Sequence, residues 1–133
     1  MSSGNVEIVR ATYEAFYHKS REEMLEFLDP GIEWDESDLP ARRPGVYHGH
    51  EGIISLMEEN ATLWENICIA IDDIAEGDDR VIAFIRAKGR GRNTGVDVEL
   101  ASAQVWTIRD GKAVHVRLYL DREEALQAAG LKV

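Results

Sequence analysis

Residues 97–121 read DVELASAQVWTIRDGKAVHVRLYLD, and this stretch decides the fold. Two runs of β-forming residues flank Arg109-Asp110-Gly111, a turn signal, so the stretch predicts a long antiparallel hairpin at the centre of a sheet. Because side chains alternate along a strand, one face of the first arm is apolar apart from Ser102 and Gln104. Such a face is typical of the wall of a ligand pocket, and equally of a core that holds two hydrogen-bonded polar groups.

The turn decides which face of the second arm joins this wall. A three-residue loop with Gly111 left-handed would pair Ile108 with Lys112, and the wall would then gain Val114, Val116, Leu118 and Leu120. A two-residue turn at Asp110-Gly111 would instead bring in His115, Arg117 and Tyr119. We expect the three-residue loop, because it gives a continuous apolar surface for helices to cover.

Length and charge bound the class of protein. A chain of 133 residues predicts one domain, residues 1–133, with a core of its own. The net charge of −10, from 25 acidic and 15 basic residues, argues against nucleic acid or an anionic membrane as a partner. The apolar runs are shorter than the roughly 20 residues of a membrane span, and the first ten residues do not resemble a signal peptide. A single cysteine, Cys68, suits a reducing compartment, so we expect a cytoplasmic protein.

Hydrophobic periodicity predicts the other elements of the chain. Helices are expected at 5–19, 20–28 and 49–64, strands at 32–36, 66–76 and 80–91, and a last helix after Asp121. Ser20 and Glu23 have the spacing of a capping box. Residues 37–49, which contain Pro40 and Pro44, predict an irregular loop that forms a pocket rim or a lid. This order indicates an α+β cone, in which helices cover one face of a bent antiparallel sheet and the wide end leaves a cavity.

Four fragments of the chain look familiar. They are YEAFYHKSREEMLEFLDPGIEW, YHGHEGI, VWTIRDGKAV and YLDREEALQAAGL. In this order they resemble the SnoaL-like branch of the nuclear transport factor 2-like (NTF2-like) superfamily. The resemblance implies a cystatin-like cone, with a strongly bent antiparallel sheet wrapped around three N-terminal helices. It also implies a homodimer that packs through the convex face of the sheet.

The resemblance allows known activities to be projected onto this chain. A cyclase of the SnoaL type has an acidic base where this chain has Leu118, which cannot accept a proton. Limonene-epoxide hydrolase needs an arginine between two aspartates, and the neighbouring strand here offers Ser102 and Gln104. Ketosteroid isomerase is matched better. In that resemblance Tyr13 falls at the oxyanion-hole tyrosine, Glu36 at the general-base carboxylate, and Gln104 at the protonated aspartic acid.

Two functions follow as expectations. The first is a small-molecule pocket protein acting as an isomerase or cyclase, by proton transfer on an apolar cyclic or polyketide-like ligand and with no cofactor. The second is a ligand-binding or dimerisation module without catalysis. His48 and His50 are two residues apart with no third ligand in range, so we expect no metal. The residues expected to line the pocket are Phe16, Trp34, Tyr47, Met57, Phe84, Ser102, Trp106, Val116 and Leu118.

Overall fold

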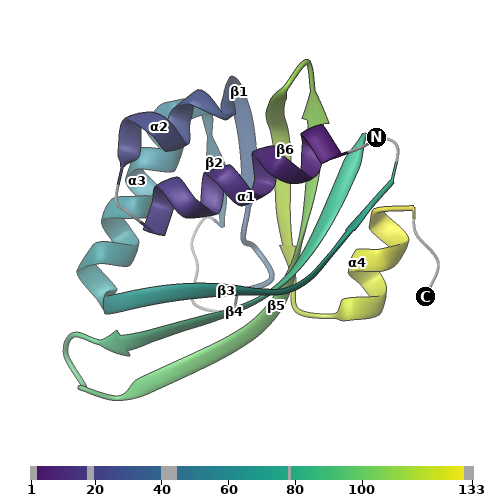
Figure 1. The fold of residues 1–133 in the computed structure, drawn as a ribbon. Coiled ribbons are helices and arrows are strands. Elements are labelled where there is room, and N and C mark those ends of the chain that lie inside the picture. Colours follow the sequence, from purple (N-terminus) through teal and green to yellow (C-terminus); the bar gives the residue numbers. More distant parts are fainter. Residues whose placement is uncertain (1–2, 18–19, 40–44, 78, 131–133) are drawn as a thin grey trace.

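The computed structural model describes residues 3–17, 20–39, 45–77 and 79–130 (Figure 1). Its elements in chain order are α1 (Ser3–Tyr17), α2 (Arg21–Glu26), β1 (Leu28–Asp35), β2 (Val46–His48), α3 (Gly49–Leu63), β3 (Trp64–Glu76), β4 (Arg80–Gly91), β5 (Asp97–Arg109), β6 (Lys112–Tyr119) and α4 (Arg122–Ala128). The strands form one six-stranded sheet in the order β2-β1-β6-β5-β4-β3. The expected α+β cone is confirmed, with β5 and β6 at the middle of the sheet.

Two apolar clusters cover opposite faces of this sheet. The larger one joins α1, α2 and α3 to the inner face, where its members include Val81, Ile85, Trp106 and Val116. The smaller one joins α4 to the outer face through Ile82, Phe84, Ala103, Val105, Ala125, Leu126 and Ala129. In Figure 1, α1 to α3 lie on one side of the sheet and α4 lies on the other. The three N-terminal helices therefore define the interior.

The hairpin between β5 and β6 differs from the expected turn but keeps the expected face. Arg109 pairs with Lys112, so the turn has two residues, and both Asp110 and Gly111 have positive φ, at 51° and 79°. A bulge follows, because Ile108 pairs with Ala113 and Thr107 pairs with His115. The extra residue, Val114, shifts the second arm by one position. Val116 then lies opposite Trp106 and Leu118 lies opposite Gln104, as expected for the three-residue loop.

The region before α3 holds more strand than the sequence indicated. β1 begins at Leu28 rather than at residue 32, and its pairing with β6 is parallel, with a shift in register between Leu28 and Glu33. Pro30 falls within that shift, where a strand tolerates a residue that lacks an N–H. The predicted loop at 37–49 contains β2, which pairs with β1. Residues 40–44, with the two prolines, lie outside the described residues.

The two predicted helix caps turn out differently. Asp121 caps α4 as expected, because its Oδ1 accepts from the backbone N–H groups of Glu123 (2.8 Å) and Glu124 (3.2 Å). The capping box at Ser20 is wrong. Its hydroxyl donates to the Glu23 carboxylate (3.1 Å) and makes no hydrogen bond to the backbone of α2.

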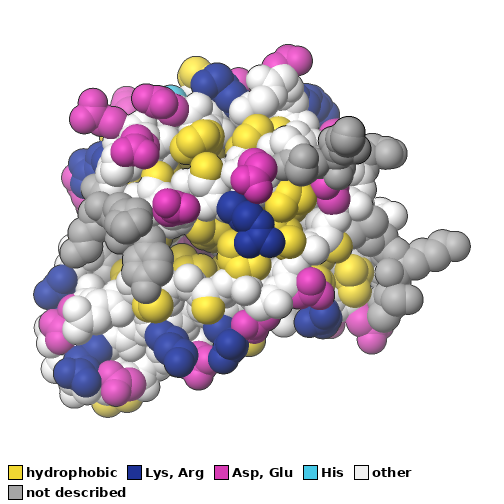
Figure 2. Space-filling view, viewed as in Figure 1, with side chains coloured by type: hydrophobic (Ala, Val, Ile, Leu, Met, Phe, Trp, Pro, Cys, Tyr) yellow, Lys and Arg dark blue, Asp and Glu magenta, His cyan; other side chains and the backbone are white. Residues whose placement is uncertain are grey.

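The surface carries charges of both signs. Figure 2 shows acidic and basic side chains interspersed on the face that Figure 1 presents, with hydrophobic side chains between them. In the part of the chain that the structure describes, no helix combines the length and the apolar character needed to cross a bilayer.

Candidate functional site

A buried hydrogen bond joins the first helix to the central strand. The Tyr13 hydroxyl, on α1, donates to Oε1 of Gln104, on β5. Tyr13 is on the apolar stripe of α1 with Val9, four residues before it, so the packing of this helix carries the phenol onto the sheet. Tyr13 is 9% exposed and Gln104 is 4% exposed. The pair therefore lies in the interior of the cone, where the sequence predicted both residues to be.

Glu36 is the third predicted member of the site, and it is buried as well, at 7% exposed. It directly follows β1, and its backbone N–H donates to the Gly45 carbonyl (2.6 Å). Its Oε2 accepts from the indole N–H of Trp34 (3.0 Å), two residues earlier on the same face of the chain. A carboxylate is thus placed in the interior with at least one donor directed at it.

The electrostatics of Tyr13 tie these residues into one group. Burial raises the pKa of the Tyr13 phenol far above its ordinary value, because the phenolate would lose its hydration. The indole N–H of Trp106 acts in the opposite direction, and the charge of Glu36 raises the pKa of Tyr13 again. Tyr13 therefore stays protonated and serves as a hydrogen-bond donor at neutral pH. We call Tyr13, Glu36 and Gln104 the polar cluster.

Aromatic rings surround the polar cluster. Trp106 packs edge-to-face against Tyr13 and against Trp34, with 5.5 Å between ring centroids in both cases. Trp106 is completely buried, and its indole N–H has no hydrogen-bond partner among the described residues. Across the hairpin, Val116 and Leu118 complete an apolar wall beside it. Three residues that the sequence predicted to line the pocket, Trp106, Val116 and Leu118, therefore lie together in the structure.

Four other predicted pocket residues lie around this centre. Trp34 on β1 pairs with Tyr47 on β2, and both side chains are buried in the inner cluster. Phe16 and Met57 are partly buried and pack against the same cluster. Ser102, one alternation beyond Gln104 on β5, is only half-buried and borders a hollow farther along the strand. The wall thus turns from interior to surface between Gln104 and Ser102.

The prediction that Phe84 lines this interior is wrong. Phe84 belongs to the outer cluster with Ala103 and Val105, on the opposite face of the sheet from Trp106. The guanidinium of Arg122 lies 3.8 Å from the centre of its ring, which is close enough for a cation–π contact. Phe84 and Ser102 both border a hollow of about 150 Å³. Phe84 therefore holds α4 against the sheet instead of facing the polar cluster.

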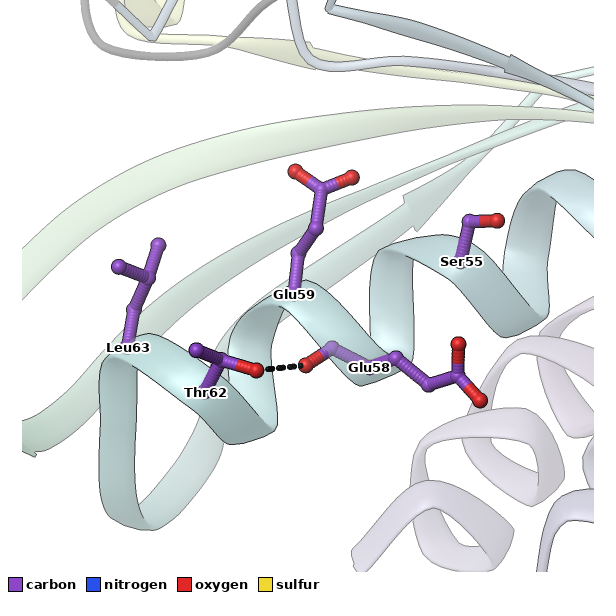
Figure 3. A pocket seen from close by; sticks show the side chains of 5 residues that line it. All are labelled: Ser55, Glu58, Glu59, Thr62 and Leu63. Atoms are coloured by element: carbon purple, nitrogen blue, oxygen red, sulfur yellow. Dashed lines mark hydrogen bonds between the residues drawn. The ribbon is translucent and has the colours of Figure 1, made fainter.

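A larger hollow of about 530 Å³ runs along α3. Its described lining residues are Ser55, Glu58, Glu59, Thr62 and Leu63, which recur at helical spacing and are drawn in Figure 3. None of them belongs to the polar cluster. The link between the two regions is Tyr47, whose hydroxyl donates to Glu59 Oε1 (3.2 Å) while its backbone pairs with that of Trp34.

Sequence reasoning missed Glu59, although a signal for it existed. Glu59 stands three residues after the buried Leu56, at the edge of the apolar stripe of α3. A carboxylate at such an edge usually reaches solvent. Glu59 instead accepts a hydrogen bond from the buried Tyr47. Tyr47 is on β2, a strand that the sequence did not predict, so only the tertiary structure reveals this contact.

His48 and His50, the two histidines considered as metal ligands, lie at the end of β2 and in the first turn of α3. Among the described residues, no group of three His, Cys, Asp or Glu side chains could hold a metal ion. His50 contacts the Leu28 carbonyl oxygen through Nε2 (2.8 Å), and His48 approaches Glu33 (3.9 Å) on the sheet. The two side chains therefore have separate partners.

Comparison with known proteins gives a family and a fold. Residues 9–116 match the SnoaL-like domain family. An NTF2-like protein of unknown function from Burkholderia pseudomallei K96243 has a TM-score of 0.81 and 26% identity, over 97% of this chain and 98% of that one. TerC, co-crystallised with polyporic acid, has a TM-score of 0.78 and 26% identity, over 95% of this chain and 97% of that one. A protein of ketosteroid isomerase-like fold from Catenulispora acidiphila DSM 44928, in complex with trimethylamine, has a TM-score of 0.75 and 17% identity, over 95% and 94% of the two chains. No curated protein matches.

Proposed function

The chain belongs to the family of SnoaL-like domains, and from this premise we propose that it binds a small, largely apolar cyclic or polyketide-like molecule and moves a proton beside a carbonyl group of that molecule. One observation carries the proposal. A carboxylate, a protonated phenol and an amide, from Glu36, Tyr13 and Gln104, are buried together against aromatic rings. A base and neutral donors in one buried site are the groups that enolisation of a ketone requires.

The step uses these groups as follows. The Glu36 carboxylate takes a proton from the carbon next to the carbonyl. The electrons of that C–H bond form a C=C bond, and the π electrons of the carbonyl move onto its oxygen. Tyr13 donates a hydrogen bond to this developing enolate oxygen. Glu36 then returns the proton to another carbon of the conjugated system, which regenerates the carbonyl and leaves an isomer, so no external oxidant or cofactor enters the balance.

Electrostatics supports this division of roles. The negative charge starts on Glu36 and ends on the ligand oxygen, so the total charge inside the cluster does not change. A phenol that remains protonated because it is buried can donate to that oxygen throughout the reaction. Gln104 supplies a neutral amide, whose N–H group can donate to an oxygen as well.

The ligand must open an existing hydrogen bond. Tyr13 donates to Gln104 in the structure, so a ligand carbonyl would replace Gln104 Oε1 as the acceptor of that proton. The hollow of about 530 Å³ along α3 has the size of a small-molecule pocket. Its contact with the interior through Glu59 and Tyr47 supports it as the entrance. TerC, at 26% identity, was crystallised with an organic compound, polyporic acid, and this supports an organic ligand here.

A second function is favoured by the apolar wall. Leu118 lies opposite Gln104 and Val116 lies opposite Trp106, and neither of these two side chains can accept a proton. A domain that holds its ligand without converting it needs only such a wall and the donors. Binding of a ketone with no exchange of its protons would identify this second function.

We also propose that two copies pair through the outer face of the sheet, as the family resemblance implies. That face carries the stacked pair Arg117 and Tyr119, with 4.8 Å between the guanidinium carbon and the ring centre, and both side chains are partly exposed. Sedimentation velocity at several concentrations should give a dimer that Tyr119→Asp weakens. A monomer at all concentrations would contradict this pairing.

Proton exchange tests the proposed chemistry directly. 2-Tetralone, a flat bicyclic ketone, exchanges its acidic C–H protons for deuterium in D₂O, and ¹H NMR follows their loss. We expect the wild-type protein to accelerate this exchange, and Glu36→Gln to lower the protein-catalysed rate about 100-fold or more, because general-base catalysis typically contributes that much. The matched control is Glu33→Gln, three residues earlier on the outer face of β1, which should keep the wild-type rate. Equal rates for wild type and Glu36→Gln would remove Glu36 from the reaction.

A further inference from the structure

The indole N–H of Trp106 is a buried polar group that the proposed reaction has not used. Trp106 has no exposed surface, and its Nε1 approaches the Tyr13 phenol oxygen but meets hydrogen-bond geometry with none of the described residues. Buried donors in folded proteins nearly always have a partner, so an unpaired one requires an explanation such as a bound water or ligand. The other indole of this cluster, that of Trp34, has its partner in Glu36.

The position of this N–H restricts its partner. Trp106 contacts the Tyr13 ring edge-to-face, and its N–H lies near enough to the phenol oxygen to stabilise a negative charge there. An indole N–H only donates, so the missing partner must be an acceptor. The neighbouring Glu36 already brings a negative charge. A neutral oxygen is therefore favoured over an anionic one in the resting complex.

The side chains that surround the Trp106 ring restrict the kind of ligand that can bind there. Trp34 and Trp106 stand at an interplanar angle of 78°, and Tyr13 and Trp106 at 70°. Val116, opposite Trp106 on β6, adds a buried aliphatic side chain. Because these side chains are aromatic and aliphatic, they favour a planar, largely apolar molecule that has one polar atom at its edge.

We infer that the Trp106 indole N–H is a ligand-binding donor, which together with the Tyr13 hydroxyl holds the carbonyl oxygen of a neutral, flat, cyclic ketone. The inference rests on the proposed function, since it places a ligand in the same site. It adds a residue and a substrate class to that function. Trp106 thereby selects ketones over hydrocarbons of equal shape, and it donates to the oxygen on which the enolate charge develops.

A pair of probes tests this selection. 2-Tetralone and tetralin have the same ring system and differ in the carbonyl oxygen. Trp106→Phe keeps an aromatic ring and removes the N–H. We expect this variant to lower the ratio of the two affinities, ketone over hydrocarbon, about 3- to 10-fold, as the loss of one neutral hydrogen bond does. Trp64→Phe, at the start of β3 and outside the polar cluster, is the matched control and should leave the ratio unchanged. An unchanged ratio in Trp106→Phe would overturn the inference.

A measurement on the wild-type protein covers the case in which Trp106→Phe does not fold. ¹H–¹⁵N spectra resolve the indole N–H signals, and Trp106 can be assigned through its contacts with the rings of Tyr13 and Trp34. 2-Tetralone should move this signal downfield and tetralin should not. A Trp106 signal that stays in place while the ketone binds would contradict the inference.

The outcomes separate this inference from the proposed function. Ketone selection by Trp106 without proton exchange would leave the inference standing and make the protein a binding module. Exchange that depends on Glu36, with no response of Trp106, would leave the chemistry standing and reject the inference. A wild-type protein that binds neither probe would reject both.

Discussion

The hydrogen bond between Tyr13 and Gln104 can be measured through the stability of the protein. Tyr13→Phe removes the donor and leaves Gln104 Oε1 buried without a partner, and Gln104→Leu leaves the Tyr13 hydroxyl in the same situation. Each single substitution should lower the free energy of unfolding by about 1–3 kcal/mol, the cost of one unsatisfied buried polar group. Tyr13→Phe/Gln104→Leu removes both partners, so its loss should be smaller than the sum of the two single losses by about 1–2 kcal/mol.

Urea unfolding at one fixed protein concentration gives these values, since any dimer would make stability depend on concentration. With an m-value of about 2 kcal/mol/M, each single variant should unfold at a urea concentration about 0.5–1.5 M lower than the wild type. Phe16→Leu, on the same helix and only packed against the core, combined with Gln104→Leu, gives a matched cycle that should be additive. Additivity of Tyr13→Phe and Gln104→Leu to within about 0.5 kcal/mol would refute the contact.

Two further predictions concern ionisation and the hairpin. The pKa of Tyr13 is raised in the folded state, so this tyrosine should stay protonated between pH 9 and 11. Ultraviolet absorbance should therefore show the same number of ionising tyrosines in the native wild type and in native Tyr13→Phe. In urea, where both proteins are unfolded, the wild type should ionise one tyrosine more. The free energy of unfolding of the wild type should exceed that of Tyr13→Phe by a constant amount below pH 10, the approximate pKa of an unfolded tyrosine. Above pH 10 this difference should fall by about 1.4 kcal/mol per pH unit. A difference that stays constant above pH 10 would mean that Tyr13 titrates normally. Gly111→Ala should cost about 1 kcal/mol in urea unfolding, because φ is +79° there and an added Cβ meets no atom within 4 Å, so the loss comes from the backbone alone. Gly4→Ala, on α1 and equally free of contacts, should not destabilise, and equal effects of both substitutions would contradict the two-residue turn.

The hairpin shows how much of the fold the sequence could predict. The turn signal and the alternation of apolar residues were enough to place β5 and β6, and the preference for a continuous apolar wall chose the correct face. The turn itself was wrong, because Asp110-Gly111 forms a two-residue turn and a bulge at Val114 restores the register. Bulges follow from the packing of the whole sheet, so neighbouring residues alone did not reveal this one.

Phe84 shows where the alternation of hydrophobic and polar residues along a strand does not identify its inner face. Residues 81–85 of β4 are all buried, because helices cover both faces of the sheet at this point. With Val81 and Ile85 on one face and Ile82 and Phe84 on the other, hydrophobicity does not indicate which face is the interior. The position of α4 against the outer face shows which side chains of β4 face outward.

The polar cluster was predicted through family resemblance, and the structure adds what residues alone could not show. Tyr13 and Gln104 are 91 residues apart in the chain and meet because α1 packs against the inner face of the sheet. The unpaired N–H of Trp106 is a property of distances in three dimensions. The sequence could suggest that Trp106 lines a pocket, but it could not show that the indole lacks a partner.

A crystal structure of the protein with 2-tetralone tests the central claim most directly. The account predicts that the ketone oxygen lies about 3 Å from Tyr13 Oη and from Trp106 Nε1, within hydrogen-bond distance of both, with Gln104 Oε1 displaced from the phenol. A ketone bound only in the hollow along α3 or elsewhere, with Tyr13 still donating to Gln104, would contradict it.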